Sequence, residues 1–86
     1  MTVFIDDAYI EKNGRFYCHL MSDELSDDEL HNFAIKMGLP HHRFHRDHYD
    51  VTADLRETAV SLGAIPCKPS DLVKIRRKKR RYYQTS

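Results

Sequence analysis

Residues 41–52 connect the two clearest helical patterns of this sequence, and they read His41-His42-Arg43-Phe44-His45-Arg46-Asp47-His48-Tyr49-Asp50-Val51-Thr52. The segment holds four of the six histidines in the 86-residue chain. Binding and catalytic residues concentrate in connecting segments that a rigid scaffold positions. We therefore interpret this segment as the place of a functional site, and we expect residues 43–50 to be extended.

The helix that precedes this segment has the strongest signals. Ser26 and Glu29 have the spacing of a capping box in which Ser26 is the N-cap. Leu25 and Leu30 have the spacing of a hydrophobic staple around the same helix start. Gly38 can end the helix in the left-handed conformation. The apolar side chains of the predicted helix share one face, and they are Leu30, Phe33, Ala34 and Met37.

Two more helices are predicted after the histidine segment. Thr52 is a suitable N-cap for the first of them, and Gly63 can end it. Its expected buried stripe consists of Leu55, Ala59 and Leu62. The second begins at residues 69–71, and its only apolar anchors are Leu72, Val73 and Ile75. Beyond these anchors nothing is left to bury, so residues 76–86 either continue as an exposed helix or fray.

The N-terminal part of the chain predicts a hairpin. Residues 2–5 form a short β-branched and aromatic run, and residues 15–21 form another after Asn13-Gly14, a pair that favours a tight turn. Residues 64–67 are a further short extended segment. The predicted fold is a small single α/β domain of order β-β-α-β-α-(β)-α, with α+β as the alternative. Its short sheet, with an N-terminal hairpin, is covered by two or three helices.

The charge of the chain is divided unequally. Residues 1–73 carry seven Lys or Arg and thirteen Asp or Glu, whereas residues 74–81 carry seven Lys or Arg and no acid. The net charge of +1 therefore combines an acidic body with a basic end. We divide the chain into a compact domain over residues 1–75 and a basic C-terminal tail or exposed helix extension over residues 76–86.

Composition and motifs exclude several classes of protein. An apolar fraction of 41% is normal for a folded domain and excludes wholesale disorder. No apolar run approaches the roughly 18 residues of a membrane span, and the N-terminus lacks the features of a signal peptide. Cys18 and Cys67 are isolated, so we expect reduced thiols in a cytoplasmic protein. Dinucleotide-binding, P-loop and serine-hydrolase motifs are missing from the sequence.

Several short motifs follow one another in a distinctive order over residues 1–75. They are residues 1–7, His19 in an aromatic strand, residues 29–31, Phe33-Ala34 ahead of Gly38-Leu39, Phe44, residues 48–52, Arg56, Ala59 and residues 62–64. In their order and spacing they resemble an uncharacterised family, domain of unknown function 4031. Members of that family often have tryptophan at the position of Phe44 and a longer loop before His48, and His41, His42 and His45 look particular to this chain. The resemblance implies a compact α/β domain of bacterial or phage origin and assigns no activity.

One candidate site combines carboxylates and histidines from three segments. Asp6 and Asp7 end the first predicted strand, a common position for functional carboxylates in α/β proteins. His48 and Asp50 lie two residues apart and point to one face of an extended segment, and His19 completes the set. The set suits Mg²⁺ or Mn²⁺ at a phosphodiester, or Zn²⁺ if more histidines join, with Asp6, His48 and Asp50 as candidate ligands. The structural alternative is that the aspartates cap the hairpin and the other groups hydrogen-bond locally.

A second candidate is a Zn²⁺ site formed by the histidines of residues 41–48 alone. His41, His45 and His48 would share one face if this segment were helical. The preceding Pro40 and the lack of an apolar stripe argue against a helix there.

The third candidate is a surface for nucleic acid, a nucleotide or another phosphate-bearing ligand. Its basic residues are Arg43, Arg46, Lys74, Arg76, Arg77, Lys78, Lys79, Arg80 and Arg81. Such side chains attract phosphates, and Tyr82-Tyr83 add rings on which bases can stack. Binding of this ligand class is the leading functional hypothesis. The alternatives are a metal-dependent phosphoesterase or nuclease that uses the carboxylate–histidine set, and a phage or accessory protein that modulates a partner protein.

Overall fold

The computed structural model describes residues 2–85, with side chains as far as Arg81. The strands are β1 (Val3–Ile5), β2 (Ile10–Lys12), β3 (Arg15–Ser22), β4 (Phe44–His45), β5 (His48–Thr52) and β6 (Ile65–Pro66). The α-helices are α1 (Asp28–Met37), α2 (Arg56–Ser61) and α3 (Pro69–Thr85), and short 3₁₀ turns cover His41–Arg43 and Ala53–Leu55. One mixed sheet and three helices confirm the predicted α/β class.

The strand β3 is the centre of the sheet. The sheet order is β4-β5-β3-β1-β6. β3 pairs antiparallel with β5 on one side, and on the other side it pairs first with β2 and then with β1. The predicted hairpin turn is confirmed, because Asn13 and Gly14 have φ angles of 53° and 79°. At the far edge β6 runs parallel to β1.

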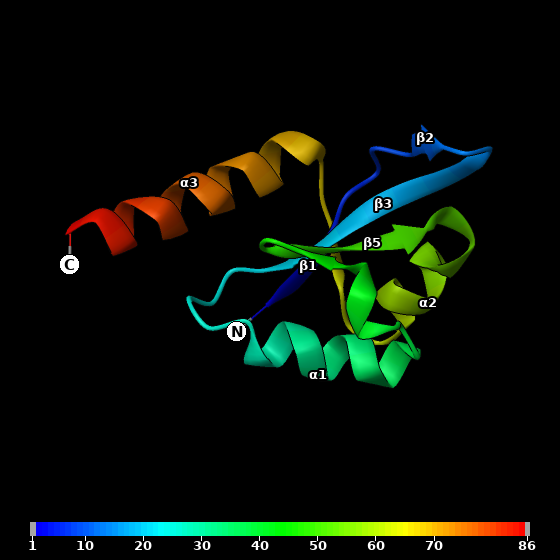
Figure 1. The fold of residues 1–86 in the computed structure, drawn as a ribbon, viewed down its shortest axis with the longest axis horizontal. Coiled ribbons are helices and arrows are strands. Elements are labelled where there is room, and N and C mark those ends of the chain that lie inside the picture. The colour runs from blue at the N-terminus through cyan, green and yellow to red at the C-terminus, as the bar shows by residue number, and fades with distance from the viewer. Residues whose placement is uncertain (1, 86) are drawn as a thin grey trace.

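One face of the sheet carries the main core. Side chains along a strand alternate between its two faces, and α1 and α2 cover the face that bears the apolar set (Figure 1). The buried core residues are Val3, Ile5, Cys18, Leu20, Leu30, Ala34, Leu39, Tyr49, Val51, Ala59 and Ala64. The intervening residues of β3 and β5, which include His19, His48 and Asp50, therefore point to the opposite face.

The helix α1 begins one residue later than the capping box predicts. Asp27 is its N-cap and makes no side-chain cap hydrogen bond, although the hydroxyl of Ser26 accepts one from the N–H of Asp28 at 3.2 Å. A carboxylate oxygen of Glu29 is buried without a partner among the described residues, so the reciprocal half of the box is missing. Gly38 ends the helix with a φ of 75°, as predicted.

The second predicted helix is shorter than expected, and part of its buried stripe is wrong. Thr52 makes no cap hydrogen bond, and a 3₁₀ turn precedes α2. Ala59 is fully buried, but Leu62 is 45% exposed. The α-helix ends at Ser61, with Leu62 as its C-cap, so the buried stripe stops at Ala59.

The helix α3 continues through the basic run, so the predicted boundary between residues 75 and 76 falls inside a helix. α3 lies on the side of the sheet opposite α1 and projects beyond it, which gives the protein dimensions of 40 × 23 × 22 Å (Figure 1). Leu72 is buried, and Ile75 lines a cavity together with Phe4 of β1. None of the helices formed by residues 2–85 is both long and apolar enough to cross a membrane.

Candidate metal centre

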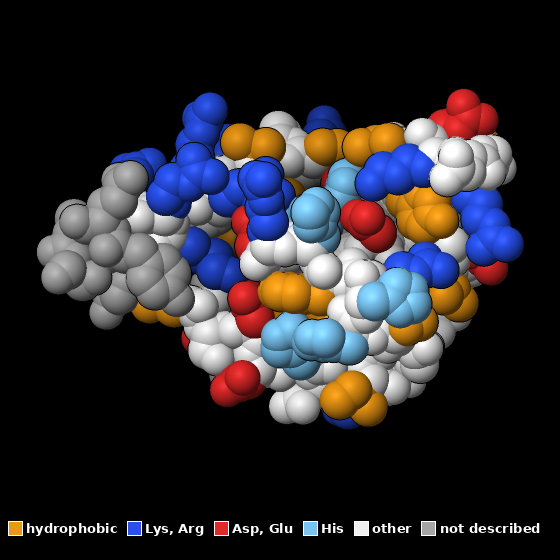
Figure 2. Space-filling model, in the orientation of Figure 1, with side chains coloured by type: hydrophobic (Ala, Val, Ile, Leu, Met, Phe, Trp, Pro, Cys, Tyr) orange, Lys and Arg blue, Asp and Glu red, His pale blue; other side chains and the backbone are white. Residues whose placement is uncertain are grey.

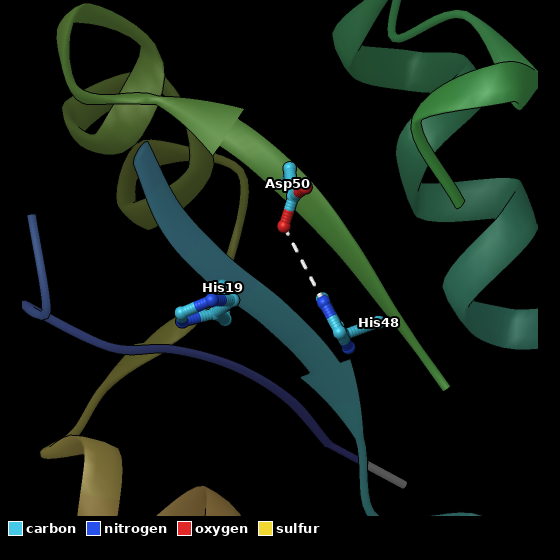
Figure 3. Close-up of side chains that lie close together, drawn as sticks. All are labelled: His19, His48 and Asp50. Carbon is cyan, nitrogen blue, oxygen red and sulfur yellow. Dashed lines mark ion pairs between the residues drawn. The ribbon is translucent and has the colours of Figure 1, made fainter. Parts of the chain in front are cut away.

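Three side chains from neighbouring strands meet on the sheet face opposite the core (Figure 3). His19 projects from β3, and His48 and Asp50 project from β5, where Asp50 is the direct cross-strand partner of His19. One potential ligand atom from each of the three residues lies within 4.8 Å of the other two. We call these three residues the donor cluster. Within the described part of the chain it is the only such group of three metal-ligating side chains.

The buried carboxylate of Asp6 orients His19. Its Oδ2 atom accepts a hydrogen bond from Nδ1 of His19 at 2.8 Å, and its Oδ1 atom accepts one from the backbone N–H of His19 at 2.8 Å. The side-chain hydrogen bond raises the pKa of His19, against the opposing effect of burial. Burial by itself would raise the pKa of Asp6, but the hydrogen bonds from His19 outweigh it and lower that pKa. Because Nδ1 of His19 is occupied, Nε2 is left to bind a ligand, as in metal-binding histidines.

Asp47 orients His48 in the same way. Oδ1 of Asp47 lies 2.9 Å from Nδ1 of His48, while Nε and Nη2 of Arg76 donate to the two carboxylate oxygens at 2.7 and 3.2 Å. Burial would raise the pKa of Asp47, but the hydrogen bonds from His48 and Arg76 prevail and hold the pKa well below its usual range. The Asp47 carboxylate therefore joins a member of the donor cluster to α3.

The third member, Asp50, has one oxygen that lacks a donor. Its Oδ1 atom is buried and accepts no hydrogen bond from any residue that the structure describes. Nε2 of His48 lies 3.3 Å away, at ion-pair distance but without hydrogen-bond geometry. The other oxygen, Oδ2, is 3.4 Å from Nζ of Lys12. A buried carboxylate oxygen without a donor costs free energy, and a cation between the three side chains would satisfy it.

The structure brings together three of the five predicted site residues. Asp6 accepts a hydrogen bond from Nδ1 of His19 and is not a member of the donor cluster, although we predicted it as a ligand. Asp7 is exposed in the segment after β1 and lies outside the cluster as well. The structure therefore places Asp6 beside His19, and the catalytic or ligand roles predicted for the two aspartates stay predictions.

The histidine segment does not form the helix that a local Zn²⁺ site would need. Residues 41–43 form a 3₁₀ turn, and β4 and β5 follow. The extended conformation expected for residues 43–50 is therefore confirmed for residues 44–45 and 48–50, whereas Arg43 belongs to the 3₁₀ turn and residues 46–47 form the turn between the two strands. His41 lies against the rings of His31 and Phe44 at centroid distances of 5.2 and 6.1 Å. His45 is exposed, with its ring centroid 6.0 Å from that of His48.

The structure separates the predicted basic residues into three groups. Arg76 and Lys79 are held by the body, through Asp47 and through the carbonyl oxygen of Ser22 respectively. Arg43 lies over the ring of Tyr17, 5.7 Å from its centroid. The exposed group consists of Arg46, Lys74, Arg77, Lys78, Arg80 and Arg81. The side chains of Tyr82 and Tyr83 lie outside the described residues.

Sequence reasoning missed two residues of the site. Asp47 precedes His48 directly, so its adjacency to a candidate ligand was an available signal. Lys12 lies 38 residues before Asp50 in the chain. Only the pairing of β2 and β5 with opposite sides of β3 brings this amine to the carboxylate, and no local pattern contains that information.

Most of the chain matches a known protein family. The family model described as Protein of unknown function (DUF4031) matches residues 3–79, from β1 into α3. The chain belongs to this family. The DUF4031 match includes the whole donor cluster, and it confirms the resemblance inferred from the short motifs. No curated protein and no solved structure is significantly similar to the chain.

We expect Asp47→Asn to lower the free energy of unfolding at pH 7 by roughly 1.5–3 kcal/mol, the range for hydrogen bonds to charged groups. The pKa of Asp47 is lowered by folding, so its contribution is present above the unfolded-state value of 3.8 and is lost as the pH falls through the folded value. Urea unfolding of the variant and of the wild type at about pH 7 and about pH 3 measures this contribution of Asp47 to stability. The difference between variant and wild type should shrink at the lower pH, and an equal difference at both would contradict the assignment.

Proposed function

We propose that this DUF4031 protein is a divalent-metal-dependent phosphoesterase whose metal is held by His19, His48 and Asp50. One observation carries the proposal, namely three ligand atoms within 4.8 Å in a cluster whose histidines are both oriented by carboxylates. Two imidazoles and one carboxylate suit Zn²⁺ or Mn²⁺ better than Mg²⁺, which prefers oxygen ligands. Three protein ligands leave coordination positions open for water and substrate.

The metal would supply two effects at this site. It would polarise a phosphoryl oxygen, and it would lower the pKa of a bound water so that a nucleophile exists near neutral pH. In the hydrolysis, a water oxygen forms a bond to phosphorus and one P–O ester bond breaks. One water proton ends on the leaving alcohol, and the other goes to the product phosphate or to solvent. Water is the only co-substrate of this step.

The charge around the donor cluster supports an anionic substrate. Lys12 contacts the cluster at Asp50, and His48 borders a cavity that is lined by three arginines, which are Arg46, Arg76 and Arg80. Guanidinium groups form charge-assisted and often bidentate hydrogen bonds with phosphate oxygens. A phosphate ester bound here would place its anionic oxygens between a metal ion and these cations.

The test begins with protein stripped of metal by a chelator. Calorimetric titration with Zn²⁺, Mn²⁺ and Mg²⁺ should show one bound equivalent and tighter binding of Zn²⁺ or Mn²⁺ than of Mg²⁺. Hydrolysis of bis(para-nitrophenyl) phosphate and of a short oligonucleotide should require the added metal and stop when chelator is returned. Metal binding without hydrolysis of either substrate would remove the phosphoesterase proposal, and absence of binding would remove the metal centre itself.

A second function, the binding of nucleic acid, is favoured by the exposed cations of α3. Lys74, Arg77, Lys78 and Arg80 are all exposed on this 17-residue helix, which extends over about 25 Å. The first and last of these four positions lie six residues apart, which is about 9 Å along the helix axis, and cations spread over that distance can contact more than one phosphate of a nucleic-acid strand. Substitution is the suitable test, because truncation would also remove Arg76 and Lys79 from the body, and affinity for oligonucleotides should fall steeply with salt.

A further inference from the structure

A cavity of about 410 Å³ adjoins the donor cluster between the β4–β5 turn and α3. Its lining consists of His45, Arg46, Asp47, His48, Arg76 and Arg80. His48 is therefore shared between the cavity and the donor cluster. Figure 2 shows the same arrangement on the surface, with Lys and Arg side chains over α3 next to histidine side chains of the sheet.

The lining of this cavity is cationic, and two of its cations have no partner among the residues whose side chains are described. The single carboxylate, that of Asp47, is already engaged by His48 and by two nitrogen atoms of Arg76. Arg46 and Arg80 are exposed, and within the described residues neither side chain makes a hydrogen bond or an ion pair. Two free guanidinium groups beside a neutralised carboxylate are suited to an anion, because each can donate charge-assisted hydrogen bonds to it.

The backbone at Arg46 is strained. Arg46 has a φ of 64° in the two-residue turn between β4 and β5, a conformation that glycine and asparagine adopt readily and arginine does not. A residue held in this region without a local structural advantage is often a functional one. The turn keeps the arginine at the cavity that His48 borders, and glycine would satisfy the turn at lower cost.

We propose that this cavity is a subsite for the phosphate adjacent to the one that the metal centre hydrolyses, with Arg46 and Arg80 as its binding residues. The inference rests on the proposed phosphoesterase function and names its substrate class. The substrate is a phosphodiester with a second phosphate on the adjoining nucleotide, as in a nucleic-acid strand. The nucleic-acid strand then continues along the exposed cations of α3.

The experiment compares two ligands that differ in one phosphate. A dinucleotide with and without a 5′-terminal phosphate is titrated into isotope-labelled protein by NMR, in chelator, so that binding is measured independently of any metal. The wild-type protein should bind the phosphorylated dinucleotide more tightly, with resonance shifts at Arg46 and Arg80. Equal affinity for the two ligands would overturn the subsite.

Matched variants separate a built subsite from general attraction to a basic helix. Arg80→Gln should weaken binding of the phosphorylated dinucleotide roughly tenfold, the value of a charge-assisted hydrogen bond. Arg77→Gln removes the same charge from an exposed position of α3 that does not line the cavity, so it should weaken binding of this short ligand less than Arg80→Gln does, through a screened general attraction alone. Equal effects of the two variants would refute the proposal.

Arg46→Gly distinguishes a role of Arg46 in phosphate binding from a purely structural role in the turn. Glycine relieves the positive φ, so the melting temperature should stay equal or rise while affinity for the phosphorylated dinucleotide falls roughly tenfold. A variant that lost neither affinity nor stability would overturn the role of Arg46. If the phosphate preference is present in chelator but hydrolysis with metal is absent, the subsite stands and the phosphoesterase function falls.

Discussion

Asp50→Asn, His19→Ala and His48→Ala will each weaken Zn²⁺ or Mn²⁺ binding by at least roughly 100-fold relative to the wild-type protein. The three side chains supply the only described group whose ligand atoms lie within 4.8 Å of one another. Loss of one ligand from a three-ligand site removes more affinity than loss of an orienting group, for which 10–100-fold is typical. Competition with a chelator of known affinity, followed on metal-free protein, measures the change.

The matched control is the double variant His41→Ala/His42→Ala. It removes two exposed imidazoles from the same segment while the donor cluster remains intact. We expect its metal affinity to stay near that of the wild type. If the double variant lost the metal and Asp50→Asn kept it, the bound ion would be held by the exposed histidines. The donor cluster would then not be the metal site.

Asp6→Asn extends the same series to a positioning residue. The amide can no longer hold His19 as a carboxylate does, so the metal affinity should fall by about 10–100-fold, less than on loss of a ligand. Asp6 is 1% exposed and also accepts the backbone N–H of His19. For that reason, thermal unfolding of the metal-free variant should be measured beside the affinity, so that a loss of folding is not mistaken for a loss of ligand orientation.

The sequence predicted the parts of the site that depend on local periodicity. His48 and Asp50 are two residues apart on a strand, so a shared face follows from the alternation of side chains alone. Asn13-Gly14 fixes the hairpin and with it the phase of β3, which decides the face on which His19 lies. The cross-strand register of His19 with Asp50, in contrast, is a long-range property, and only the structure shows it.

The parts that sequence reasoning missed depend on partners distant in the chain. Residues beyond Ile75 have nothing apolar to bury, and yet α3 is held in place, because Arg76 finds Asp47 and Lys79 finds a backbone carbonyl at the end of β3. Leu62 was assigned to the core on helical spacing, but α2 ends one residue before it. Ion pairs and helix ends of this kind follow from tertiary packing, which overrides local propensity.

Leu20→Ala will lower the free energy of unfolding by about 2–5 kcal/mol, the range for a large-to-small change in a closed core. Leu20 is completely buried at the centre of β3. A chain of this size has a total stability of only roughly 4–13 kcal/mol, so the melting temperature should fall on the order of 10–40 °C. Ile35→Ala is the control, because Ile35 is 72% exposed on α1, and its effect should stay within about 0.5 kcal/mol. Equal losses in the two variants would show that this face of β3 is not the core.

The same variant connects the core to the metal centre. Leu20 and His19 are consecutive in β3 and point to opposite faces, so the core substitution leaves the donor cluster chemically intact. A metal that binds only the folded protein adds stability, about 2.7 kcal/mol at a concentration 100 times its dissociation constant. Zn²⁺ should therefore restore much of the stability lost by Leu20→Ala and none of that lost by Leu20→Ala combined with Asp50→Asn. If Zn²⁺ restored the stability of both variants equally, the ion would bind outside the donor cluster, because only the second variant lacks a ligand of that cluster.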